Sequence, residues 1–338
     1  MGPSVGSLPP VERVRPGIWS IPVPLPNNSL LYVLVYVFET DAGPYIVDAG
    51  WNTDDALAAL RSGLEAAGTG LAEVQGVLVT HIHPDHYGLA GRVREESGAW
   101  IGLHPADAAL ISGRYVDPSV LLEGMGAMLR RMGAPADEIS TLQYASMPVR
   151  ALVDAVRPDV LFEDGARPDV PDWDLTSIWT PGHSPGHVCF WEPRHRVMLS
   201  GDHVLPRITP NISFHPQAGE NPLGDYLASL ERLRPYDATE VLPAHEHRFA
   251  GLQERLTELR AHHEHRFEEI VAAIGDGRTT AWEIAECMHW SRSWDRIDGF
   301  MRRAAVGEAM AHLRTLEARG IVREVHGEPS LWRLTTSA

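Results

Sequence analysis

The sequence VLVTHIHPDH, at positions 77–86, joins two local patterns that decide the fold. Its first four residues form a short, mostly apolar run, which is typical of a buried strand. The next six contain three histidines and one aspartate. Imidazole and carboxylate groups are ligands of zinc and neighbouring first-row metals, and a turn at a strand end holds them in a fixed geometry. We therefore expect a metal site where this strand ends.

Three further segments repeat the arrangement later in the chain. They read TPGHSPGH at 180–187, SGDH at 200–203 and LPAH at 242–245. In each, a run with strand character ends in a turn that carries a histidine or an aspartate. Five histidines and two aspartates are enough ligands for two metal ions. The candidate ligands are His81, His83, Asp85, His86, His183, Asp202 and His245.

Strands and helices alternate around these segments. The predicted strands are residues 30–39, 44–47, 77–80, 175–180, 187–191, 196–200 and 240–242. The predicted helices, with apolar residues three or four positions apart, are 54–67, 223–233 and 252–274. This alternation predicts an α/β fold built of layers of helices and sheets.

Residues 105–172 interrupt the alternation. The stretch is rich in proline and contains two predicted helices, at 120–132 and 141–156. Three methionines recur at helical spacing in the first of them, which indicates a helix face packed on the core. We interpret the stretch as an insertion beside the metal site.

The C-terminal residues 275–338 follow a different order. Two helices are predicted at 280–288 and 307–319, and a hairpin at 321–325 and 330–334. This order resembles a winged-helix domain. From residue 276 onward nine arginines balance nine carboxylates, so this module lacks the positive charge that favours nucleic acid. Its three tryptophans favour a structural cap or a homodimer contact.

Composition excludes several functional classes. The chain has 338 residues, of which 44% are hydrophobic and 22% charged, as in ordinary globular proteins. No apolar run approaches a membrane span, no secretory signal pattern is present, and two distant cysteines form no disulfide framework, so we expect a cytoplasmic protein. A net charge of −16 argues against binding a phosphate backbone. All basic side chains are arginines, which excludes lysine-based catalysis.

The four ligand segments, in this order, resemble those of the metallo-β-lactamase-fold hydrolase superfamily over about residues 12–250. The resemblance implies a four-layer αββα sandwich as the catalytic domain, a linking helix at 251–274 and a separate module at 275–338. It implies one metal on His81, His83 and His183, a second on Asp85, His86 and His245, and Asp202 as the bridge. Asp48 matches a family aspartate that supports the ligand loop from behind.

Two such ions imply a hydrolase in which a bridging hydroxide attacks a carbonyl group. We expect two Zn²⁺ ions, with Mn²⁺ or Fe²⁺ as alternatives that suit the same ligands. Asp85 is also a candidate proton relay to the leaving group. Ser184 does not lie in a Gly-x-Ser-x-Gly turn, so it is expected to shape its loop and not to act as a nucleophile.

The resemblance leaves the substrate open, because family members include lactonases, thioesterases, hydroxyacylglutathione hydrolases, β-lactamases and ribonucleases. An aspartate at position 202, in place of cysteine, resembles the lactonase, thioesterase and nuclease branches. We expect a small acyl substrate with an ester, thioester or lactone bond, covered by the insertion. The alternatives are a ribonuclease or phosphodiesterase and a β-lactam hydrolase.

Other residues near the ligand segments are weaker candidates. Tyr87 could donate to an oxyanion, and His203, His215 and His247 could touch substrate, although a supporting or solvent position is the ordinary interpretation. Three histidines of the long helix, at 262, 263 and 265, are expected on a solvated face.

Overall fold

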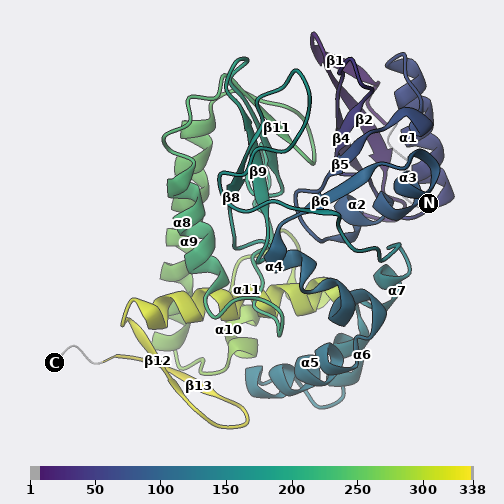
Figure 1. Cartoon of the computed structure of the whole chain (residues 1–338). Helices are drawn as coiled ribbons and strands as arrows, with labels where there is room; N and C mark the ends of the chain where they lie inside the picture. The colour runs from purple at the N-terminus through teal and green to yellow at the C-terminus, as the bar shows by residue number, and fades with distance from the viewer. Residues whose placement is uncertain (1–7, 336–338) are drawn as a thin grey trace.

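The computed structural model describes residues 8–335, and two mixed β-sheets lie face to face at its centre (Figure 1). The first sheet contains seven strands in chain order. They are β1 (Glu12–Arg15), β2 (Ile18–Pro24), β3 (Tyr32–Phe38), β4 (Tyr45–Val47), β5 (Gly76–Leu78), β6 (Trp100–Leu103) and β7 (Val160–Leu161). Strands β1 to β4 pair antiparallel, and β4 to β7 pair parallel.

The second sheet contains four strands in the order β11-β10-β9-β8. They are β8 (Thr176–Trp179), β9 (Val188–Glu192), β10 (Val197–Gly201) and β11 (Glu240–Pro243). Only β10 and β11 pair parallel. The helices beside this sheet are α8 (Pro222–Arg232) and α9 (Leu252–Gly275), and those beside the first sheet are α1 (Asp54–Ala66), α2 (Pro84–Tyr87) and α3 (Ala90–Ser97), next to a short turn η1 (Leu71–Glu73).

Strand β3 shows how alternate residues build the layers. Val33, Val35 and Val37 pack in the cluster that holds the apolar faces of α1 and α3. Leu34 and Tyr36, on the opposite face, pack in a cluster shared with the second sheet. Because side chains alternate across a strand, one continuous apolar run fills both the helix layer and the space between the sheets. The predicted αββα sandwich is confirmed, and Figure 1 shows its four layers.

No strand was predicted over β2, whose residues Pro22 and Pro24 are unusual in a strand interior. The register explains how they fit. Strand β1 pairs with β2 only as far as Ser20, so the residues after it face an open edge on that side. Proline lacks a backbone N–H and is tolerated where no neighbouring strand accepts one.

The insertion forms short helices at one end of the sandwich. It contains α4 (Pro105–Ala108), a single turn η2 (Ser112–Val116), α5 (Ser119–Met132), α6 (Ile139–Tyr144) and α7 (Met147–Arg150). The predicted continuous helix at 141–156 is wrong: α6 ends at Tyr144, and Pro148 lies in the first turn of α7, where its missing N–H costs nothing. Met125 and Met132 of α5 are buried in the core, as expected.

The C-terminal elements follow the predicted order of helix, helix and hairpin. They are α10 (Ala281–Cys287), a turn η3 (Trp294–Arg296), α11 (Gly299–Ala318), β12 (Val322–Val325) and β13 (Leu331–Leu334). Helix α11 begins earlier than predicted and packs on α6, α8 and α9. One apolar cluster runs from Met198 in the second sheet through Leu230 to Trp282 and Ala309. The domain boundary, the winged-helix resemblance and the homodimer contact stay predictions.

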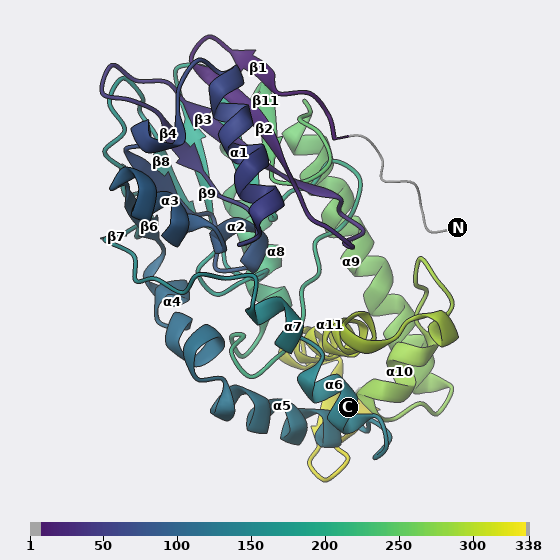
Figure 2. The same ribbon diagram turned by 90° about the vertical axis from the view of Figure 1, so that its right-hand side faces the viewer.

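In Figure 2 the insertion helices α5 to α7 gather with α10 and α11 at the lower end of the molecule. The C-terminal helix α11 therefore packs on α6 of the insertion. None of the helices within residues 8–335 has the length and apolar character that a membrane crossing requires.

Candidate metal centre

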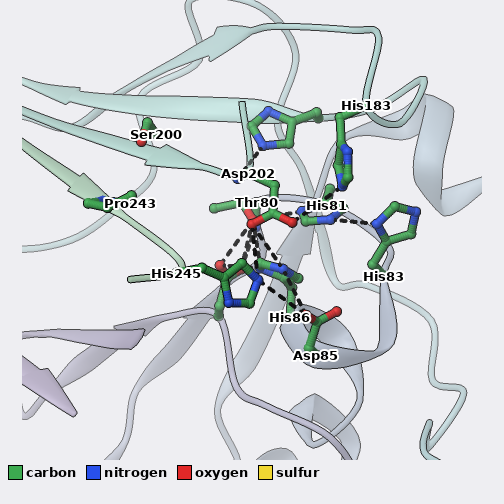
Figure 3. Close-up of polar contacts among 12 residues, drawn as sticks. Thr80, His81, His83, Asp85, His86, His183, Ser200, Asp202, Pro243 and His245 are labelled. Atoms are coloured by element: carbon green, nitrogen blue, oxygen red, sulfur yellow. Dashed lines mark hydrogen bonds and ion pairs between the residues drawn. The ribbon is translucent and has the colours of Figure 1, made fainter. Parts of the chain in front are cut away.

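The seven candidate ligands come together at one edge of the two sheets (Figure 3). Each follows the end of a strand or its turn: β5 leads into the first four ligands, and β8, β10 and β11 lead into the other three. Three overlapping groups each have ligand atoms within 4.8 Å of one another. They are His81, His83 and His183; His81, His86 and Asp202; and Asp85, His86 and His245. Hereafter the first is called the three-histidine group and the last the carboxylate group.

Asp202 lies between these two groups. Its Oδ2 is 3.4 Å from Nε2 of His183, while its Oδ1 is 3.2 Å from Nε2 of His245 and 3.5 Å from Nε2 of His86. In the carboxylate group, Oδ2 of Asp85 is 3.3 Å from Nε2 of His245. The two oxygens of Asp202 thus point to different groups, which is the geometry that a bridging carboxylate needs.

Several polar atoms at this point are buried without a hydrogen-bond partner. They are Nε2 of His86, His183 and His245 and Oδ1 of Asp202. Leaving such atoms unpaired in the protein interior costs free energy, so native proteins rarely do so. Three nitrogen lone pairs and a carboxylate oxygen directed at a common space suit divalent cations, and the donor set fits zinc, manganese or iron.

Hydrogen bonds from the other ring nitrogen orient three of the histidines. Nδ1 of His86 donates to Asp48 Oδ2 at 2.8 Å, Nδ1 of His183 to the backbone oxygen of Asn211 at 3.0 Å, and Nδ1 of His245 to that of Tyr32 at 2.9 Å. Because Nδ1 carries the proton, Nε2 is left as the lone-pair donor.

Asp48 supports the first ligand segment as well as His86. Its Oδ1 accepts from the backbone N–H of Thr80 at 2.8 Å and from the Thr80 hydroxyl at 3.0 Å. Its backbone φ is 64°, in the left-handed region that non-glycine residues seldom adopt. This strained backbone conformation places the Asp48 carboxylate under the ligand loop.

The two groups differ in electrostatics. Burial and then the neighbouring histidines hold the pKa of His81 well below its usual value, and burial followed by His183 and Arg114 does the same to the pKa of His83. Burial also lowers the pKa of His86 and His245, but nearby carboxylates outweigh it. The pKa of His86 is therefore raised well above its usual value, and that of His245 to about 10.

Two supporting residues were missed from the sequence. His187 is fully buried, and its Nε2 accepts from the backbone N–H of Asp202 at 3.2 Å, so it helps to position Asp202. Asp107 is also fully buried and accepts from the backbone N–H of Ile82 at 2.9 Å and of Gly186 at 2.7 Å. The motif at 180–187 already contained His187, whereas nothing in the sequence marked Asp107.

Ser184 and Tyr87 have structural roles. The Ser184 hydroxyl donates to Asp107 Oδ2 at 2.8 Å, which shapes the loop as expected. Tyr87 is fully buried, its hydroxyl donates to the backbone oxygen of Val156, and it is not directed at the metal centre as an oxyanion donor would be.

The remaining histidines separate by burial. His203 is buried against His187 and Tyr226, His215 is half-buried, and His247 is exposed. The expectation that the long helix carries its histidines on a solvated face is wrong for His263. That ring is 1% exposed and its Nδ1 lies 3.1 Å from Nε2 of His312, because α9 packs on α11.

Comparison with known proteins places this geometry in a family context. The model of the Metallo-beta-lactamase superfamily matches residues 29–245, which include all seven candidate ligands. A Bacillus subtilis protein named "Probable metallo-hydrolase YqjP" is 28% identical over 295 residues, covering 85% of this chain and 88% of that protein. "Acyl-coenzyme A thioesterase MBLAC2" of Gallus gallus is 28% identical over 64% of this chain and 73% of its own length.

Two solved structures are similar to this protein over nearly the whole chain. The crystal structure of a metallo-beta-lactamase family protein from Thermus thermophilus has a TM-score of 0.82 and 31% identity, covering 96% of this chain and 100% of that chain. A beta-lactamase domain protein from Burkholderia ambifaria has a TM-score of 0.83 and 28% identity, and the match covers 96% of this chain and 94% of that chain. The C-terminal elements are therefore included in both similarities.

Proposed function

Since this chain belongs to the metallo-β-lactamase superfamily and is a metal-dependent hydrolase, we propose that it hydrolyses a small acyl substrate at an ester, thioester or lactone bond with two divalent metal ions. The position of Asp202 carries the proposal, because each of its oxygens faces a different ligand group. We favour a thioester, since a relative that covers 64% of this chain is named an acyl-coenzyme A thioesterase.

The proposed division of ligands follows the distances in the site. The three-histidine group would hold one cation, the carboxylate group the other, and Asp202 would bridge them. When bound, such a pair of cations acidifies a water molecule and polarises the carbonyl that the water attacks. Asp48, Asn211 and Tyr32 keep Nε2 of three ligands directed at the centre.

Asp85 is slightly more exposed than Asp202. The exposed fraction of its side chain is 14%, against 10% for Asp202. A carboxylate that reaches both the ligand set and solvent can pass a proton to the leaving group. We propose this relay as a second role for Asp85.

The test is a substrate panel with the zinc-loaded protein. It contains an acyl-coenzyme A, a neutral acyl thioester, a lactone, a β-lactam, an activated phosphodiester and single-stranded RNA. We expect turnover of the thioesters that is abolished by chelation and restored by zinc. Turnover of RNA or the phosphodiester alone would replace the proposal with the nuclease alternative, and turnover of the β-lactam alone would replace it with a lactamase.

A further inference from the structure

We propose that an anionic group of the substrate, a carboxylate or a phosphate, binds beside the metal centre between Arg114 of the insertion and Arg303 of α11. The inference rests on the proposed hydrolysis at that centre and specifies the substrate further. Three observations support it. Arg114 lies in a turn attached to a ligand loop, and neither arginine has a carboxylate partner among residues 8–335. Contacts also hold the insertion and α11 against the ligand loops.

The turn η2 is attached directly to the first ligand loop. The hydroxyl of Tyr115 donates to the backbone oxygen of Ile82 at 2.7 Å, and Ile82 lies between two metal-ligand candidates. On the other side, the guanidinium of Arg150 donates to the backbone oxygens of Tyr115 at 2.7 Å and of Val116. Arg114 is next to Tyr115 in this turn, so its backbone is held close to the first ligand loop.

Arg114 forms no ion pair with any carboxylate in the described part of the chain. No carboxylate lies within ion-pair distance of it among residues 8–335, and its Nη1 is buried without a hydrogen-bond partner. A buried guanidinium nitrogen with nothing to donate to is costly, and a ligand anion would remove that cost. This is unusual in a chain with 45 acidic and 29 basic residues.

Arg303 approaches from the C-terminal region. It is 9% exposed, and its Nη1 donates to the backbone oxygen of Leu142 at 3.2 Å and to the Ser146 hydroxyl at 3.4 Å. It too lacks a carboxylate partner among the described residues. Burial, and then the positive charge of Arg114, lower the pKa of Arg303 to about 10, so the two guanidinium groups lie within electrostatic reach of each other.

The loop at 211–219 connects these arginines with the metal centre. Its Asn211 holds His183, and the backbone N–H of Phe214 donates to the oxygen of Gly307 in α11 at 2.9 Å. A Cβ added to Gly113 in η2 would lie 3.5 Å from Nε2 of Gln217. The loop is therefore packed between the insertion and α11, and Figure 2 shows α6 and α11 beside each other.

The positive charges of Arg114 and Arg303 also act on His215 in this loop. Burial, and then Arg114 and Arg303, lower its pKa to about 3, so the ring is neutral. Two arginines and a neutral imidazole form a site for an anion, since the guanidinium fork matches the oxygens of carboxylate and phosphate. Among described arginines that are not exposed, only Arg114, Arg150 and Arg303 lack a carboxylate partner, and all three lie here.

The anion could belong to either end of the substrate. A carboxylate could end the acyl chain, or a phosphate could belong to the leaving group. Three zinc-dependent assays separate these sources: the N-acetylcysteamine thioesters of pentanoate and of glutarate, which differ only in the terminal carboxylate, and pentanoyl-coenzyme A, whose phosphates are on the leaving group.

The variants are Arg114→Gln and, as a matched control, Arg333→Gln, which removes an exposed arginine without a carboxylate partner. We expect the wild-type kcat/KM for one charged thioester to exceed that for the neutral one by about tenfold or more, from a charge-assisted hydrogen-bond pair. Arg114→Gln should remove this preference mainly through KM, so that kcat/KM falls much more for the charged thioester than for the neutral one. Arg333→Gln should change none of the three.

A binding measurement tests the anion subsite independently of the hydrolytic function. Glutarate and inorganic phosphate should raise the melting temperature of the wild type and of Arg333→Gln, and neither should raise that of Arg114→Gln. Equal rates for charged and neutral thioesters, or a uniform loss in Arg114→Gln, would overturn the subsite while turnover of the neutral thioester leaves the hydrolase proposal intact. If no thioester is turned over, the melting shifts alone decide the subsite.

Discussion

The two ligand groups of the candidate metal centre lie on either side of Asp202 but differ in charge. The three-histidine group contains rings whose pKa values are lowered, chiefly by burial, so these rings are neutral at neutral pH. The carboxylate group contains imidazoles whose pKa values adjacent carboxylates raise. One edge of the fold therefore offers a neutral site and an anionic site a few ångströms apart. A binding cation must compete with protons to a different extent in each site.

Asp202→Ala should have the largest effect, because it removes the residue that both groups share. The loss of several kcal/mol of charge stabilisation predicts a fall in kcat/KM of about a thousandfold. Metal analysis should show a lower content than in the wild type. Asp137→Ala, at an exposed position, is the control. Retention of wild-type activity by Asp202→Ala would remove the bridge from the account.

Acidification should separate the two groups. In the carboxylate group the raised pKa values mean that a cation must displace protons, so metal affinity falls as the pH falls, by about tenfold per pH unit for each proton displaced. The lowered pKa values of the three-histidine group predict little change over the same range. Chelator competition between pH 8 and 6 should show one ion lost first, and parallel loss of both would contradict the difference.

Asp48→Asn should weaken one group more than the other. It removes the carboxylate that accepts directly from Nδ1 of His86 at 2.8 Å, whereas the three-histidine group reaches Asp48 only through the Thr80 hydroxyl, which lies 3.1 Å from Nδ1 of His81. Loss of an orienting partner of this kind lowers metal affinity by about 10- to 100-fold. Thr80→Ser keeps the hydroxyl that also contacts Asp48 and is the matched control. Titration with Zn²⁺ should show weakening of a single site.

Glu308→Ala should give the smallest effect, on the opposite group. The Asn211 amide donates to Glu308 Oε2 at 3.2 Å, and the Asn211 backbone oxygen orients His183. Loss of one hydrogen bond predicts a three- to tenfold change, about 0.5–1.5 kcal/mol, in metal affinity of the three-histidine group. Glu308→Gln, which retains an acceptor oxygen, should restore most of it. A change confined to the carboxylate group would contradict this link.

The sequence predicted the parts of this site that local patterns encode. Each ligand candidate follows a strand end, and strand-end turns are recognisable from apolar runs that stop at glycine, proline or histidine. The alternation of strands and helices predicted a layered α/β fold, and the resemblance to the superfamily specified the αββα sandwich. The same reasoning found the order of the C-terminal elements, although the start of α11 at Gly299 was missed.

What the sequence could not predict depends on contacts between distant segments. Asp107 joins Ile82 to Gly186, which are separated from it by 25 and 79 positions. His263 was expected in solvent because nothing along α9 indicates that α11 covers it. The prolines of β2 concealed a strand whose tolerance for them comes from an open edge. In each case the deciding interaction lies in tertiary packing.

The number and position of bound metal ions would show whether Asp202 bridges two of them. Elemental analysis of the zinc-loaded protein, combined with anomalous diffraction, should show two ions per chain about 3.5–4 Å apart, one at each ligand group with Asp202 between them. Absence of bound metal, or ions located away from these side chains, would contradict the account.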